Sequence, residues 1–72
     1  MTLSEYMRKV RRGLEMSQQE LAIELNVSYS SVNRWENMQV VPSKLARKSF
    51  LDFCKTRSIP IPDDILEDKE NE

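Results

Sequence analysis

Histidine is absent from this 72-residue chain, and cysteine and glycine occur once each, as Cys54 and Gly13. A single cysteine excludes an internal disulfide, and one thiol without any histidine argues against a structural zinc site. One glycine cannot form a glycine-rich loop that holds a nucleotide phosphate. We therefore expect no metal, no cofactor and no enzyme, since a chain of this size has little room to preorganise catalytic groups.

Long apolar segments are absent as well. No run approaches the ~18 residues that a membrane span needs, and no short hydrophobic stretch follows a basic start as in a secretory signal. An unpaired thiol suits a reducing compartment. The sequence thus predicts one small cytoplasmic domain with no membrane partner and no evident small-molecule ligand.

The net charge is −1, but the charged residues are unevenly distributed along the chain. Residues 1–61 carry ten Lys/Arg and six Asp/Glu, a balance of +4, whereas residues 62–72 carry six acids and only Lys69, a balance of −5. A basic body suits a polyanionic partner such as nucleic acid. The acidic end is interpreted either as a solubilising frayed terminus or as a segment that binds a basic protein.

Two short helices joined by a tight turn are predicted between residues 17 and 37. Ser17 and Glu20 form a capping box, which marks a helix start, and apolar residues then recur at helical spacing. Asn26 ends this helix because Asn tolerates a positive φ, and Ser28 is a good N-cap for the next one. We expect helices over residues 18–25 and 29–36, which must cross steeply in a helix-turn-helix.

The outward face of the second helix carries hydrogen-bonding side chains, as a helix in a DNA major groove requires. Its inward face carries Val32 and Trp35, and we expect Trp35 to be a core residue rather than a ligand platform. The outward residues are Tyr29, Ser30, Asn33, Arg34 and Asn37.

The remaining sequence predicts an all-α fold, a compact four-helix bundle with a fifth short helix as an open alternative. Further helices are expected over residues 3–13 and 44–57, with a last turn near residues 63–66. Prolines make residues 59–62 extended. We divide the chain into a helix-turn-helix domain over residues 1–58 and a proline-containing, acidic extension over residues 59–72. The apolar set expected in the last long helix is Leu45, Ala46, Phe50, Phe53 and Cys54.

Together these residues resemble the phage repressor and Cro-type, or Xre-like, DNA-binding domains, over roughly residues 3–54. The matching positions are the run from Gln18 to Ala22, then Val27, Ser28, Val32, Trp35, Glu36, Asn37 and Pro42. The chain departs from the family at Asn26 and Met38, where glycine is common. The resemblance implies a lambda-repressor-like fold and a transcriptional regulator, specifically a repressor, that binds double-stranded DNA.

Roles for individual residues follow from the helix face and from the resemblance. We expect base readout by Tyr29, Ser30, Asn33 and Arg34; the alternative is an ordinary solvated helix face. Arg34 suits guanine, and Asn33 suits adenine. We expect phosphate contacts from Gln18, Ser28, Asn37 and Lys44. The alternatives are that Gln18 and Ser28 only cap helices, that Asn37 caps the C-terminus of its helix, and that Lys44 is a loose surface side chain. The resemblance also implies a structural ion pair between Arg11 and Glu36, expected to be partly exposed and worth about 0–1 kcal/mol.

Two questions of partnership stay open in the sequence. The alternative to a regulator is an antitoxin or another interaction module that uses the acidic C-terminal tail. We also expect a weak homodimer on a palindromic site, because one recognition helix reads few base pairs. Its expected interface is the end of the last long helix with the isoleucine–proline segment, where apolar residues exceed what one small core absorbs: Phe50, Leu51, Phe53, Ile59 and Ile61. The alternative is that this segment folds back over the helix and covers it within one chain.

Overall fold

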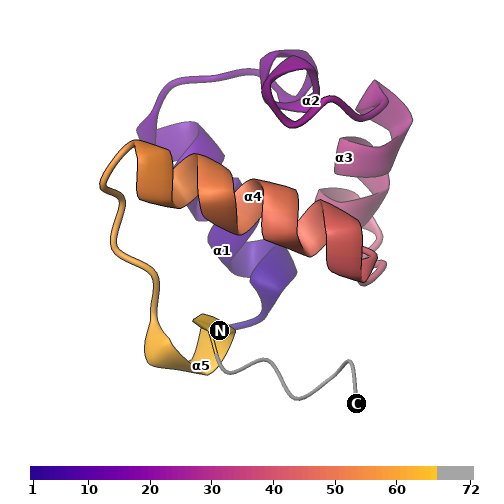
Figure 1. Cartoon of the computed structure of the whole chain (residues 1–72). Helices are drawn as coiled ribbons and strands as arrows, with labels where there is room; N and C mark the ends of the chain where they lie inside the picture. Colours follow the sequence, from indigo (N-terminus) through magenta and orange to yellow (C-terminus); the bar gives the residue numbers. More distant parts are fainter. Residues whose placement is uncertain (67–72) are drawn as a thin grey trace.

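Local side-chain chemistry sets where the helices begin in the computed structural model, which describes residues 1–66. Thr2 and Glu5 form one capping box and Ser17 and Glu20 another, each with its two reciprocal hydrogen bonds of 2.7–3.1 Å. The five helices of the described residues are α1 (Leu3–Gly13), α2 (Gln18–Leu25), α3 (Tyr29–Asn37), α4 (Lys44–Thr56) and α5 (Asp63–Leu66) (Figure 1).

A three-residue turn joins α2 to α3 and fixes their relative orientation. Asn26 takes the left-handed conformation (φ 59°, ψ 44°) that its short polar side chain tolerates. The half-buried Val27 packs against the core, and the Ser28 hydroxyl accepts a hydrogen bond of 3.1 Å from the Ser31 N–H. The predicted helix-turn-helix is therefore present, and Figure 1 shows α2 and α3 together at one end of the bundle.

The end of α3 differs from the prediction. Asn37 is the last helical residue rather than the C-cap, and its side chain contacts Arg8 and Asn33 instead of capping the helix. Met38 follows with a negative φ of −109°, and the positive φ that reverses the chain lies one residue later, at Gln39 (φ 53°).

One hydrophobic core fills the space between α1, α2, α3 and α4. Phe50 of α4 is fully buried and meets the Tyr6 ring of α1 edge-on, with ring centroids 5.9 Å apart. In the view of Figure 1, α4 crosses in front of α1. Trp35 is 7% exposed, which confirms that it is a core residue. The predicted all-α fold is confirmed, and residues 1–66 contain no strand.

One apolar residue of α4 does not lie where the sequence placed it. Leu45 is 75% exposed, whereas the other four residues of the predicted set are buried, together with Leu51. Leu14, which follows α1, is 38% exposed, and Met16 packs against the core.

The isoleucine–proline segment folds back over its own chain. The Tyr6 hydroxyl donates a hydrogen bond to the Pro60 carbonyl, and burial raises the pKa of Tyr6 to about 12, so this donor keeps its proton at neutral pH. Ile59 and Ile61 pack against the core, and Ile65 of α5 is 4% exposed. Arg47 of α4 donates to the Ile65 carbonyl at 2.6 Å.

This packing overturns the reason for the predicted dimer interface. Phe50, Leu51 and Phe53 are buried within one chain, and the two isoleucines are half-covered by it. The expected excess of apolar surface at this place was therefore wrong. The predicted fraying of the acidic end falls on residues 67–72, which lie outside the described residues.

A search of the described helices for a membrane-spanning segment finds none of sufficient length and apolar character.

Candidate nucleic-acid interface

The outward face of α3 presents the side chains that the sequence proposed for base contact. Tyr29 is 49% exposed, and Ser30 and Arg34 are also exposed, while Asn33 is half-buried. On the opposite face, Val32 and Trp35 are buried in the core. The helix is thus held from behind, and its polar face is left open to a partner.

Arg34 is the one charged side chain among these four residues. Its guanidinium makes no hydrogen bond or ion pair with any other of residues 1–66. A guanidinium group is planar and holds its N–H donors in fixed directions. The exposed Arg34 can therefore donate two parallel hydrogen bonds to a pair of acceptors.

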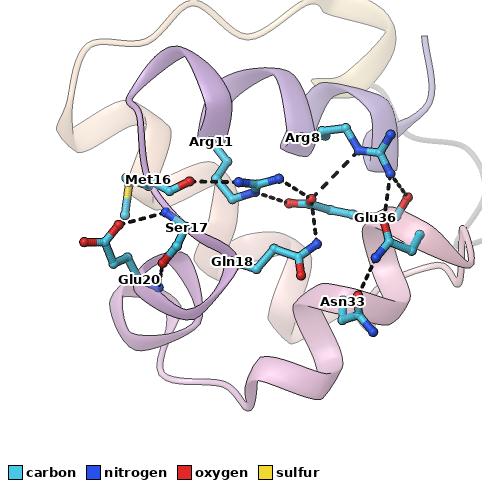
Figure 2. Close-up of polar contacts among 9 residues, drawn as sticks. Arg8, Arg11, Met16, Ser17, Gln18, Glu20, Asn33 and Glu36 are labelled. Carbon is cyan, nitrogen blue, oxygen red and sulfur yellow. Dashed lines mark hydrogen bonds and ion pairs between the residues drawn. The ribbon is translucent and has the colours of Figure 1, made fainter.

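Behind the polar face lies a buried carboxylate that joins three helices. The Glu36 side chain is fully buried, and Arg11 of α1 approaches it side-on, with Nε 2.8 Å from Oε2 and Nη2 2.9 Å from Oε1. Arg11 also donates to the Met16 carbonyl at 2.8 Å, so the loop before α2 is held by the same guanidinium. Figure 2 shows this arrangement of Arg11 between Met16 and Glu36.

The ion pair therefore exists, but its expected exposure was wrong. Arg11 is only 13% exposed at the side chain and Glu36 not at all. Burial by itself would raise the pKa of Glu36, yet the hydrogen bonds from Arg11 and Gln18 outweigh it and hold the pKa of Glu36 below its usual value. Its hydrogen bond to Glu36 also raises the pKa of Arg11. Both groups stay charged near neutral pH.

Gln18 connects this cluster to the start of α2. Its Nε2 donates to Glu36 Oε1 at 3.1 Å, and the acceptor must be the carboxylate because an ionised Glu has no proton to give. The second hydrogen of Nε2 is left for another acceptor. Gln18 thus does not cap its own helix; that position belongs to Ser17.

The other predicted phosphate-contact residues have different surroundings. Ser28 is the N-cap of α3, and its hydroxyl also contacts the Ser31 hydroxyl at 2.9 Å. Asn37 is exposed but bonded at both ends of its amide, to Arg8 and Asn33. Lys44 is exposed at the first position of α4, where a cation is unfavourable for the helix dipole.

Sequence reasoning missed Arg8. Its Nη2 donates to the Glu36 carbonyl at 2.7 Å and to Asn37 Oδ1 at 2.9 Å, and its Nε lies 3.9 Å from Glu36 Oε1. The signal was available: Arg8 stands three residues before Arg11, which places both on one side of α1.

Among residues 1–66 there is no group of three or more His, Cys, Asp or Glu side chains that could hold a metal ion.

Comparison with known proteins gives one result. A family model described as helix-turn-helix matches residues 7–46, which is more than half of the chain and runs from the first half of α1 into the start of α4. No curated protein and no solved structure matches the chain. All ten residues singled out from the sequence for DNA contact or for the ion pair fall inside the matched region.

Proposed function

This chain belongs to the helix-turn-helix family of the Cro/C1, Xre-like type, and from that premise we propose that it binds double-stranded DNA sequence-specifically and acts as a transcriptional repressor. DNA binding and a regulator-like role are properties of this family, which is not a family of enzymes. The observation that carries the finer proposal is the polar outward face of α3, held from behind by buried Val32, Trp35 and Glu36.

In this proposal α3 lies in the major groove and its exposed side chains read base edges. Tyr29 and Ser30 stand at the N-terminal end of the helix, which contacts base edges in helix-turn-helix proteins. Arg34 follows one turn later and forks onto guanine O6 and N7. Its exposure and its lack of a partner among residues 1–66 support this role.

Phosphates on either side of the groove are bound by Gln18, Ser28, Asn37 and Lys44. Gln18 offers the free hydrogen of its amide at the N-terminus of α2, where backbone N–H groups and the helix dipole also favour an anion. Lys44 is the one cation in this set, and a phosphate partner explains its unfavourable position at the start of α4.

Selection of bound sites from random duplex DNA, at a stated salt concentration, tests the proposal directly. The expected result is enrichment of a defined sequence, with affinity that falls steeply as salt rises. Lys44→Ala should weaken binding to all sequences about equally and reduce the slope of log affinity against log salt by about one unit. Lys55→Ala is the matched control, since Lys55 is an exposed cation at the far end of α4. No enriched sequence, together with equal effects of the two variants, would contradict the proposal.

The same selection addresses the number of chains on one site. We propose a weak homodimer on a palindromic site, with two α3 helices about 34 Å apart, one turn of DNA. The expected result is an inverted repeat of half-sites at that spacing and two chains per duplex in sedimentation. Because Phe50, Leu51 and Phe53 are buried within one chain, we place the contact between chains on a surface other than the one inferred from sequence.

Removing residues 67–72 should strengthen non-specific DNA binding. These residues carry four acids and Lys69, so the truncation deletes three net negative charges and leaves residues 1–66 at +2. The cut must follow Leu66, because Ile65 belongs to the core and Arg47 bonds the carbonyls of Ile65 and Leu66. The measurement is affinity for random-sequence duplex at low salt.

A full-length variant with amides in place of the four acids is the matched control, and it should bind as tightly as the truncated chain. Unchanged affinity in both would contradict the idea that the acidic end opposes DNA. If the two variants kept their affinity for DNA but no longer bound a basic protein partner, the interaction-module alternative would be favoured.

A further inference from the structure

Three side chains form a continuous relay from α1 to the polar face of α3. Arg8 Nη2 donates to Asn37 Oδ1 at 2.9 Å, and Asn37 Nδ2 donates in turn to Asn33 Oδ1. Asn33 is one of the four residues proposed to read bases, whereas Arg8 belongs to a helix behind the interface. Figure 2 shows Arg8 and Asn33 at the two ends of this path.

The chemistry of arginine gives the relay a direction. A guanidinium only donates, so the atom of Asn37 that faces Arg8 must be its oxygen, and its nitrogen must therefore face Asn33. The same logic applies one step further: the atom of Asn33 that faces the Asn37 nitrogen is its oxygen. The Asn33 amide thus turns its oxygen toward Asn37 and leaves its NH₂ group available to a partner.

The first member of the relay is firmly held. Arg8 also donates to the Glu36 carbonyl at 2.7 Å and lies 3.9 Å from the Glu36 carboxylate, which Arg11 fixes from the other side. Arginine keeps its charge throughout the accessible pH range, so the direction of the relay does not reverse.

We propose that Arg8 is a positioning residue that sets base specificity, by orienting Asn33 so that it offers donors to the DNA. This inference rests on the proposed function, in which α3 lies in the major groove. Guanine presents two acceptors there, N7 and O6, whereas the usual adenine contact needs one donor and one acceptor from the amide. Asn33 accordingly selects guanine, in place of the adenine that its residue type alone suggests.

The first test replaces Arg8 with methionine, which keeps the aliphatic stem and removes every donor. In site selection the wild-type chain should prefer guanine at the position that Asn33→Ala identifies. Arg8→Met should reduce the guanine-to-adenine ratio at that position by at least about fivefold, the lower end of the discrimination given by a bidentate contact. Other positions should keep their preferences.

The matched control is Arg12→Met on the same helix. Arg12 is exposed and makes no side-chain hydrogen bond or ion pair with residues 1–66, so this variant loses the same charge without touching the relay. It should weaken binding to all sequences and leave the guanine preference intact. Arg8→Met in the Asn33→Ala background should change nothing further at the Asn33 position, because the two residues act through one contact.

A second variant reverses the relay without altering its shape. Asn37→Asp replaces the donor that faces Asn33 with an acceptor, so the Asn33 amide should rotate and present its oxygen to the DNA. The preference should then move from guanine to a base that offers a donor, cytosine through N4 or adenine through N6. Circular dichroism and thermal melting check that each variant folds. If Arg8→Met fails to fold, the isosteric Asn37→Asp variant still tests the relay.

The possible outcomes separate the relay from the proposed function. Guanine preference that survives both Arg8→Met and Asn37→Asp while Asn33→Ala removes it would overturn the relay but leave base readout intact. A wild-type preference for adenine at that position would also overturn it. A wild-type chain that enriches no sequence at all would defeat the proposed function itself.

Discussion

Replacing Glu36 with glutamine is expected to lower the free energy of unfolding by about 3–5 kcal/mol, the cost of leaving one partner of a buried ion pair unpaired. The substitution keeps the shape of the side chain and removes its charge. Arg11, 13% exposed and bonded to both carboxylate oxygens, would then hold a positive charge without a counter-ion in the interior. A 72-residue domain has a total stability of about 4–11 kcal/mol, so the variant should lose a large share of its stability.

Urea unfolding followed by far-UV circular dichroism measures this effect. Glu24→Gln is the matched control, since Glu24 forms an exposed pair with Arg57 at 3.4 Å with side chains 44% and 37% exposed. That variant should lose only about 0–1 kcal/mol. Similar losses in the two variants would show that the buried pair is no more important than the surface one.

The same pair predicts how stability depends on pH. Because the pKa of Glu36 is lowered in the folded state, the pair contributes fully above the ordinary glutamate pKa of about 4.3. The contribution is lost as the pH falls below that value and through the lowered pKa of Glu36. The wild-type chain should therefore lose stability on acidification more steeply than Glu36→Gln, which has no proton to gain at this position.

Sequence predicted the local features of this fold well, because their causes lie within a few residues. Both capping boxes, the left-handed Asn26 and the serine caps of α3 and α4 depend on contacts three or four residues apart. Helix boundaries followed from these signals to within one residue.

The exposure of Leu45 shows where such reasoning loses precision. Leu45 was assigned to the core on its residue type, yet its neighbours at helical spacing are Ser49 and Asp52, which form a polar face. Ala46 and Phe50 continue the buried face instead. The helical spacing therefore placed Leu45 on the polar face, but the prediction gave more weight to its apolar side chain.

Burial of Glu36 was missed for a different reason. Its place four residues after Val32 points to the inward face of α3, but a charged residue there is acceptable only if a partner arrives from elsewhere in the chain. Arg8 and Arg11 come from α1, and Gln18 comes from α2. Their convergence depends on the angles between helices, which no local pattern encodes. The relay through Asn37 was invisible to the sequence for the same reason.

Arg34→Ala should weaken binding to the preferred duplex by about 1–3 kcal/mol, roughly 5–150-fold, and relax base preference at one position. The exposed Arg34 guanidinium makes no hydrogen bond or ion pair with other residues of 1–66, so its removal should leave the fold intact. Competition binding on the selected site, and on duplexes changed at single base pairs, measures both effects. Thermal melting of the free protein should be unchanged.

Two further variants determine whether Arg34 reads a base or a phosphate. Arg34→Lys keeps the charge but loses the planar fork, so it should retain most of the affinity for random DNA and still lose the guanine preference. Gln18→Ala, at the proposed phosphate contact, should weaken preferred and random sequences by the same factor. If Arg34→Ala behaved like Gln18→Ala, with equal losses on every sequence, Arg34 would be a backbone contact. Specificity would then have to come from Tyr29, Ser30 and Asn33 alone, at the N-terminal half of α3.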